Sequence, residues 1–162
     1  MYNWEAIGAV GEILGAIAVV TTLAYLAVQI RESRNATAAD IYQTRAATRA
    51  NSQFHLALNC PTYHETHSKF MAEVSSSGVD AALASLSEQE HFLVSQYFGG
   101  MASLVDNACF QYQRGFLSEA YYSRSTKGGI RMFGPVWRAL DMRVPPDLAA
   151  AIQEVAAEDA AS

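Results

Sequence analysis

The chain has 162 residues, the length of one ordinary domain, and 51% of them are hydrophobic. It carries 11 lysines and arginines against 16 aspartates and glutamates, a net charge of −5. Because nucleic-acid binding needs a clustered positive surface, this balance argues against a nucleic-acid partner. Cys60 and Cys109 lie far apart without the spacing of a disulfide framework, so both are expected to be reduced thiols.

The first predicted element is an apolar helix near the first residue. Residues 13–30 (ILGAIAVVTTLAYLAVQI) contain no charge and would extend about 27 Å as a helix; the milder AIGAVG before them lengthens the stretch beyond the roughly 30 Å of a bilayer core. We expect a transmembrane helix over residues 1–31. The alternatives are a cleaved signal peptide, against which the lack of a preceding basic residue argues, and a buried helix of a soluble protein.

The residues at the ends of this span predict its orientation. The basic residues nearest to it all follow it: Arg31, Arg34, Arg45 and Arg49. The positive-inside rule then places the C-terminal side in the cytoplasm and the N-terminus outside. Tyr2 and Trp4 are expected at the outer membrane interface.

One face of the predicted span is made of small residues and then polar ones. Helical spacing brings these together: Gly8, Gly11, Gly15, Ala18, Thr22, Tyr25 and Gln29. Gly11 and Gly15 form a GxxxG pair, which lets a second helix approach closely. We expect association, with itself or within a larger membrane complex, through the following residues: Gly8, Gly11, Glu12, Gly15, Ala18 and Thr22. The alternative is coincidence, since glycine and alanine are common in any membrane helix.

Glu12 borders this small-residue face, one turn inside the outer end of the span. Facing a partner helix, it would be driven towards its neutral form, and in an oligomer a ring of such residues could line an ion or proton path. The simpler alternative keeps Glu12 hydrated at the headgroups.

The predicted helix continues beyond the membrane, because no proline or glycine occurs between Gly15 and Cys60. We expect a stalk helix over residues 32–60 and a cytoplasmic helical domain over residues 61–162. A narrow apolar stripe along the stalk requires a cover. It consists of Ala39, Tyr42, Ala46, Ala50, Phe54 and Ala57.

In the cytoplasmic part, a helix is expected over about residues 63–74. Ser87 and Glu90 form a capping box that opens the best-defined helix, which has an apolar stripe typical of a core element. Gly99 and Gly100 within it predict a close approach to another backbone, and Gly115 predicts its C-terminal cap.

The remaining segments are expected to be short helices. Ser118 caps one that extends to about Ser125, residues 127–129 form a turn, and Pro135 is the first residue of the next. Residues 145–147 break the chain before a last helix. Since no alternating β-branched run occurs, the predicted fold is all-α, with a transmembrane and stalk helix and a small helical bundle.

Candidate catalytic chemistry is sparse. Four potential metal ligands fall within thirteen residues: His55, Cys60, His64 and His67. They could form a metal-binding sensor or enzyme site, but no second ligand cluster accompanies them, and a solvated loop and helix start explains them as well. No nucleophile or phosphate-binding motif is found, so we expect a protein without enzymatic activity or cofactor.

Polar residues gather at the end of the expected core helix: Asp106, Asn107, Gln111, Gln113 and Arg114. A buried pair between Asp106 and an arginine would fix helix packing there. A binding groove is the alternative.

Two segments, WEAIGAVGEILGAIAVVTTLAYLAVQIR at residues 4–31 and DNACFQYQRGFLSE at residues 106–119, carry a resemblance to a known group. The chain resembles small bacterial membrane proteins of unknown function, with a WEAIGAIGEI-type span and a downstream (E/D)N-x3-QY-x-x-G motif. The matching positions are Trp4, Glu5, Gly8, Glu12, Gln29, Arg31, Asn107, Gln111, Tyr112 and Gly115. The resemblance implies a bacterial inner-membrane protein of unknown function, and no activity can be carried over from the group.

Overall fold

The computed structural model describes residues 3–161, and within them the side chains other than those of residues 4–6. Tyr2 and the Trp4 side chain lie outside this described part, so their place at the outer interface stays a prediction. The structure is 87% helix and its described residues contain no strand. The all-α prediction is confirmed, as is a long first helix followed by shorter ones.

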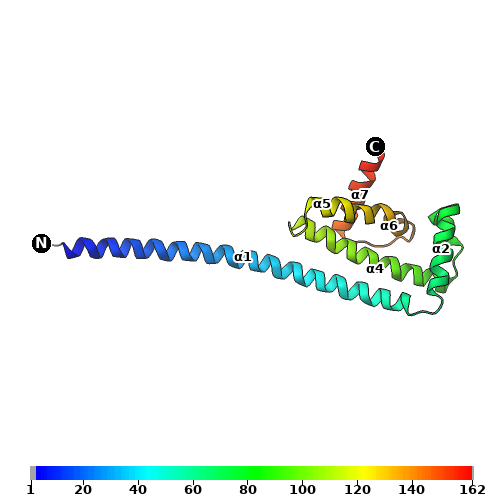
Figure 1. The fold of residues 1–162 in the computed structure, drawn as a ribbon, viewed down its shortest axis with the longest axis horizontal. Coiled ribbons are helices and arrows are strands. Elements are labelled where there is room, and N and C mark those ends of the chain that lie inside the picture. Colours follow the sequence, from blue (N-terminus) through cyan, green and yellow to red (C-terminus); the bar gives the residue numbers. More distant parts are fainter. Residues whose placement is uncertain (1–2, 162) are drawn as a thin grey trace. The chain divides into compact units, whose positions relative to one another are not determined.

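The described helices follow one another in chain order (Figure 1). They are α1 Trp4–Leu58, α2 Tyr63–Ser77, α3 Val79–Ala84, α4 Glu88–Gln113, α5 Glu119–Tyr121, the π-helix η1 Tyr122–Thr126, α6 Lys127–Ala139 and α7 Pro146–Ala161. The uninterrupted course of α1 agrees with the absence of proline and glycine along the expected stalk.

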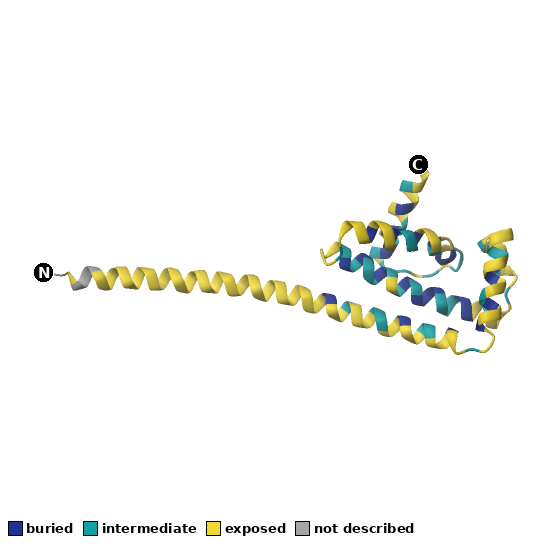
Figure 2. Ribbon diagram, in the orientation of Figure 1, coloured by how far each residue is buried: buried dark blue, intermediate teal, exposed yellow. Residues whose placement is uncertain are grey.

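The chain divides into two units after Asp40, within α1. In the first unit, every residue from Ile7 to Ala38 is exposed, as Figure 2 shows. The second unit begins at Ile41 and contains the end of α1 together with α2–α7. Residues 41–58 of the expected stalk therefore fold with the helical domain.

Helix α4 begins and ends through the local signals predicted for it. The Ser87 hydroxyl accepts from the Glu90 amide at 3.3 Å, and the Ser87 amide donates to the Glu90 carboxylate at 2.8 Å, which completes the capping box. At the other end Gly115 has φ +78°, and the Phe116 amide donates to the Gln111 carbonyl at 2.9 Å. This is the Schellman arrangement, in which a left-handed residue ends the helix.

Residues 41–58 of α1 run antiparallel to α4 within the second unit. Tyr42 stacks on Phe110 near the end of α4, with ring centroids 4.1 Å apart, whereas Phe54 packs on Tyr97 nearer its beginning, at 5.6 Å. The apolar stripe of this segment therefore packs on α4: Ala50 and Ala57 are buried, and Tyr42, Ala46 and Phe54 are half-buried.

Gly99 and Gly100 lie where α4 meets this segment. A Cβ added at Gly99 would lie 2.6 Å from Nε2 of Gln53, and one added at Gly100 would lie 2.5 Å from the Phe54 ring. The close approach predicted for the two glycines is real, but what approaches is a pair of α1 side chains rather than a backbone.

The core of the second unit lies among α4, α6 and α7, with α2 and α3 in contact with α4 and α6. Phe70 of α2 meets Phe98 of α4 edge to face at 5.8 Å. The Trp137 indole of α6 is 1% exposed and donates to the Phe98 carbonyl at 2.9 Å. Leu148 of α7 is fully buried. The aromatic side chains of Phe70, Phe98 and Trp137 thus connect α2, α4 and α6 in one core.

Four expectations for the helical domain need correction. Residues 127–129 are not a turn, and Pro135 is not the first residue of a helix, because α6 begins at Lys127 and contains Pro135. Helix α3 was not expected, and α2 extends to Ser77. The reason for α6 is tertiary: Nζ of Lys127 binds Glu154 and Glu158 of α7, at 2.8 and 2.6 Å, which offsets the low helix propensity of the following glycines.

Candidate functional site

The exposed apolar surface of α1 is the first functional feature. The helix is long and apolar enough to cross a membrane: its best 18-residue window has a mean hydropathy of 2.1, and none of that window is buried. Its large apolar side chains between Ile7 and Ile30 are 44 to 66% exposed. A core helix of a soluble protein would bury such a window, and this one does not.

Polar side chains within this segment find partners on the helix itself. The hydroxyls of Thr21 and Thr22 donate to the carbonyls of Ile17 and Ala18, each at 2.8 Å. The Gln29 amide donates to the Tyr25 hydroxyl at 2.6 Å. These bonds satisfy the hydroxyl donors of Thr21 and Thr22 and one of the two amide donors of Gln29, which suits a hydrocarbon environment.

The residues predicted to associate lie on this uninterrupted helix and are exposed: Gly8, Gly11, Glu12, Gly15, Ala18 and Thr22. A Cβ added at any of the three glycines would meet nothing within 4 Å. Packing within the described chain therefore gives no reason for glycine at these positions.

The histidines and Cys60 do not form a shared site. Among the residues that the structure describes, no group of three His, Cys, Asp or Glu side chains could hold a metal ion. His67 instead packs on Tyr63 and Tyr97, with centroids 5.6 and 5.5 Å apart, and burial lowers its pKa, helped by the charge of His64. His55 is exposed near the end of α1.

The cysteines differ in environment. Cys109 is buried in α4, and burial raises the pKa of its thiol to about 11, so the thiol stays protonated at neutral pH. Sγ of Cys60 lies 3.2 Å from the Thr62 hydroxyl, and this contact lowers the pKa of the thiol. A hydroxyl does not act as the general base that would activate a cysteine nucleophile.

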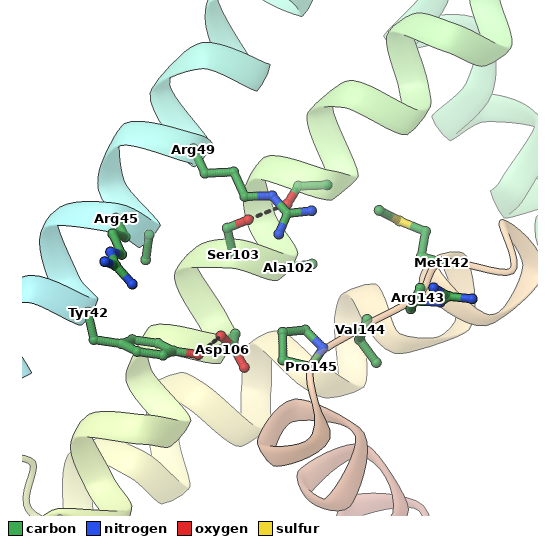
Figure 3. Close-up of a pocket in the computed structure, with 12 residues that line it drawn as sticks. Tyr42, Arg45, Arg49, Ala102, Ser103, Asp106, Met142, Arg143, Val144 and Pro145 are labelled. Atoms are coloured by element: carbon green, nitrogen blue, oxygen red, sulfur yellow. Dashed lines mark hydrogen bonds between the residues drawn. The ribbon is translucent and has the colours of Figure 1, made fainter.

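A pocket of about 220 Å³ lies between the end of α1, the middle of α4 and the connection from α6 to α7 (Figure 3). Its polar lining consists of Tyr42, Arg45, Arg49, Ser103, Asp106 and Arg143. Its apolar lining consists of Ala46, Gly99, Ala102, Met142, Val144 and Pro145.

Helix periodicity and one unusual residue build this pocket. Arg45 and Arg49 are four residues apart and share a face of α1, while Ser103 and Asp106 are three apart and share a face of α4. Residues 142–145 form the third wall of the pocket. They follow Asp141, which has a φ of +48° and lies just after the end of α6. The Met142 amide donates to the Trp137 carbonyl at 3.0 Å, which turns residues 142–145 back over the pocket.

Asp106 is the buried charge-bearing group of the site, with 5% exposure. The Tyr42 hydroxyl donates to Oδ2, whereas Oδ1 is buried without a hydrogen-bond partner. Burial raises the pKa of Asp106, and the Asp147 charge adds to this; the Tyr42 hydroxyl and the Arg49 charge oppose it. An interaction with the Leu148 amide also lowers the pKa.

Tyr42 is held as a donor to this carboxyl. Its ring is parallel to that of Phe110 within 9°, and its own pKa is raised by burial and by Asp106, so the phenol keeps its proton. Arg49 extends towards Ser103, whose hydroxyl donates to the Gly99 carbonyl at 3.1 Å (Figure 3). No residue in the described part of the chain forms an ion pair with Arg45, Arg49 or Arg143.

The structure corrects the expected buried pair between Asp106 and an arginine. Asp106 is buried as expected, but Tyr42 is its hydrogen-bond partner. Of the polar residues grouped with Asp106 in the sequence, none other lines the pocket; Arg114, for example, lies over the Phe110 ring at 5.1 Å. The pairing of Arg45 with Arg49 on one face was visible in the sequence, but their convergence with Asp106 was not.

Comparison with protein-family models, with curated proteins and with solved structures gives no match to this chain.

Proposed function

We propose that this chain is a non-enzymatic, single-pass membrane protein whose span associates with itself or with a larger membrane complex, and whose helical unit is an interaction module. The supporting observation is the exposed apolar surface from Ile7 to Ile30. Burial of one such side chain is worth about 1.5–3 kcal/mol, so a dozen of them left in water would lose a large favourable free energy. Lipid supplies the missing cover.

The proposed orientation rests on the arginines. Arg31, Arg34, Arg45 and Arg49 follow the span, which favours a cytoplasmic second unit and an outer N-terminus. The location in a bacterial inner membrane comes from the resemblance in sequence.

The proposed association rests on the glycines of the span. Each glycine within a helix costs about 1 kcal/mol relative to alanine, and Gly8, Gly11 and Gly15 have open space where a Cβ would lie. A second helix packed against this face would explain why side chains are absent there.

The absence of enzymatic activity is proposed from the side chains that could act as nucleophiles. The Cys109 thiol is buried and stays protonated, and Cys60 has only a hydroxyl beside it. Neither has the neighbouring base that nucleophilic catalysis needs.

Association is tested by bulky substitution on the small-residue face. Gly11→Leu with Gly15→Leu should abolish self-association of the full chain in a bacterial membrane reporter assay, because the leucines prevent close helix approach. Ala9→Leu with Ala16→Leu is the control, since it places two leucines at a similar average depth on the far side of the helix. This control should associate as the original chain does.

If the original chain is monomeric in this assay and both pairs of substitutions behave identically, self-association is refuted. Crosslinking and co-purification from native membranes then test the version with a larger complex. A partner that is lost with Gly11→Leu and Gly15→Leu, and kept in the control, supports that version.

A further inference from the structure

The pocket between α1, α4 and the α6–α7 connection has a carboxyl group on one wall and two guanidinium groups on another. Asp106 lines the pocket, and its Oδ1 is buried without a hydrogen-bond partner among the described residues. Arg45 and Arg49, on the opposite wall, have no ion-pair partner within the described residues. Buried polar atoms in native proteins are normally paired, so the buried Oδ1 is an exception, and the two exposed arginines are available to an anionic group.

We propose that this pocket binds a small amphoteric ligand of the α-amino acid class, with its ammonium group at Asp106, its carboxylate at Arg45 and Arg49, and a short apolar side chain between them. A simple anion would pair with the arginines but would face the Asp106 carboxyl. A simple amine would pair with Asp106 but would face the arginines. A ligand that carries both groups satisfies both walls.

The rest of the lining sets the size and polarity of the ligand. Ala46, Ala102, Met142 and Val144 are apolar and suit an aliphatic side chain. The volume of about 220 Å³ is below the roughly 300–1,000 Å³ of sites for drug-sized molecules. It is well above the roughly 30 Å³ share of one water molecule. A single aliphatic amino acid matches this range.

Binding is tested with the full chain in detergent micelles, by titration calorimetry and ligand-observed NMR. L-Alanine, L-valine and L-leucine are the probes. For valine, isobutylamine lacks the carboxylate and isovalerate lacks the ammonium group. We expect at least one of the three amino acids to bind, and both valine analogues to bind more weakly than L-valine.

Variants then place the site. Asp106→Asn keeps the size of the side chain and an acceptor for Tyr42, and Arg49→Gln removes an exposed guanidinium. Each should weaken binding about ten- to a hundredfold, the effect of losing a hydrogen bond to a charged group. Arg124→Gln, an exposed arginine outside the pocket, is the control and should bind as the original chain does. If Asp106→Asn does not fold, the double variant Arg45→Gln, Arg49→Gln provides the test.

Three results would overturn the proposal. The first is no binding of any of the three amino acids up to about 10 mM, which would leave the pocket to solvent. The second is equal binding of isovalerate and L-valine, which would mark a simple anion site. The third is binding that the pocket variants leave unchanged. The proposal goes beyond the membrane function and is independent of it, because Gly11→Leu with Gly15→Leu leaves the pocket intact.

Discussion

The contact between Phe54 and Gly100 gives the sharpest test of how α1 joins the helical unit. In Gly100→Ala the new Cβ would lie 2.5, 2.8 and 2.9 Å from three atoms of the Phe54 ring, all closer than real Cβ contacts. The ring has little room to retreat, because it packs on Tyr97 at 5.6 Å. Overpacking of this kind costs about 1–3 kcal/mol, and alanine returns about 1 kcal/mol of helix propensity. We expect a net loss of about 0–2 kcal/mol.

Two further variants isolate the contact. Gly128→Ala is the matched control, because a Cβ there meets nothing within 4 Å, and it should stabilise by about 0.5–1 kcal/mol. In a Phe54→Ala background, Gly100→Ala should also stabilise, since the obstructing ring is gone. The double-mutant cycle should therefore give a coupling energy of about 1–3 kcal/mol between positions 54 and 100.

The measurement is urea unfolding of the full chain in detergent micelles, followed by Trp137 fluorescence in a Trp4→Phe background. Trp137 is 1% exposed and reports on the core that α4 and α6 share. If Gly100→Ala stabilised as much as Gly128→Ala, with a coupling energy near zero, residues 41–58 of α1 would not pack on α4 as described.

Two more predictions concern charge. The Ser87 amide and then the Lys69 ammonium hold the pKa of Glu90 at about 2, below its ordinary 4.5, so the stabilisation from Glu90 is complete above pH 4.5 and disappears as pH falls through 2. Glu90→Gln should therefore reduce the loss of stability between these pH values. If the urea midpoint of the original chain were the same at pH 6 and pH 3, this prediction would be wrong. The Lys127 side chain is 10% exposed, whereas its partners Glu154 and Glu158 are 54% and 40% exposed. The double variant Glu154→Gln, Glu158→Gln leaves a buried ammonium without an ionic partner. It should therefore lower the unfolding midpoint more than Lys127→Met does. Equal shifts would contradict this asymmetry.

Local chemistry explains which elements the sequence could predict. The capping box of Ser87 and Glu90 and the left-handed cap at Gly115 need only residues within one turn, and both were found. The start of α6 depends instead on carboxylates of α7 that bind Lys127 from about thirty residues away. Intrinsic propensity pointed to a turn there, whereas the chain continues from η1 into α6 without a break and Lys127 pairs with α7.

The pocket was out of reach for the same reason. Asp106 and Arg45 were both noticed in the sequence, one as a candidate for a buried pair and the other as a marker of orientation. Their shared site depends on α4 running antiparallel to the end of α1 and on Asp141 adopting a left-handed conformation that its residue type does not require. Neither condition leaves a local signal.

The glycines connect these cases. At Gly115 the reason for glycine is the backbone angle of that residue, and the sequence alone discloses it. At Gly100 the reason is a ring elsewhere in the chain, so the sequence discloses a close approach but not what approaches. At Gly11 and Gly15 the described chain offers neither a left-handed angle nor a neighbouring atom. A helix tolerates such residues at a cost of about 1 kcal/mol each, and the partner helix that we propose in the membrane would offset this cost. The substitution of these two glycines by leucine therefore tests whether the partner exists.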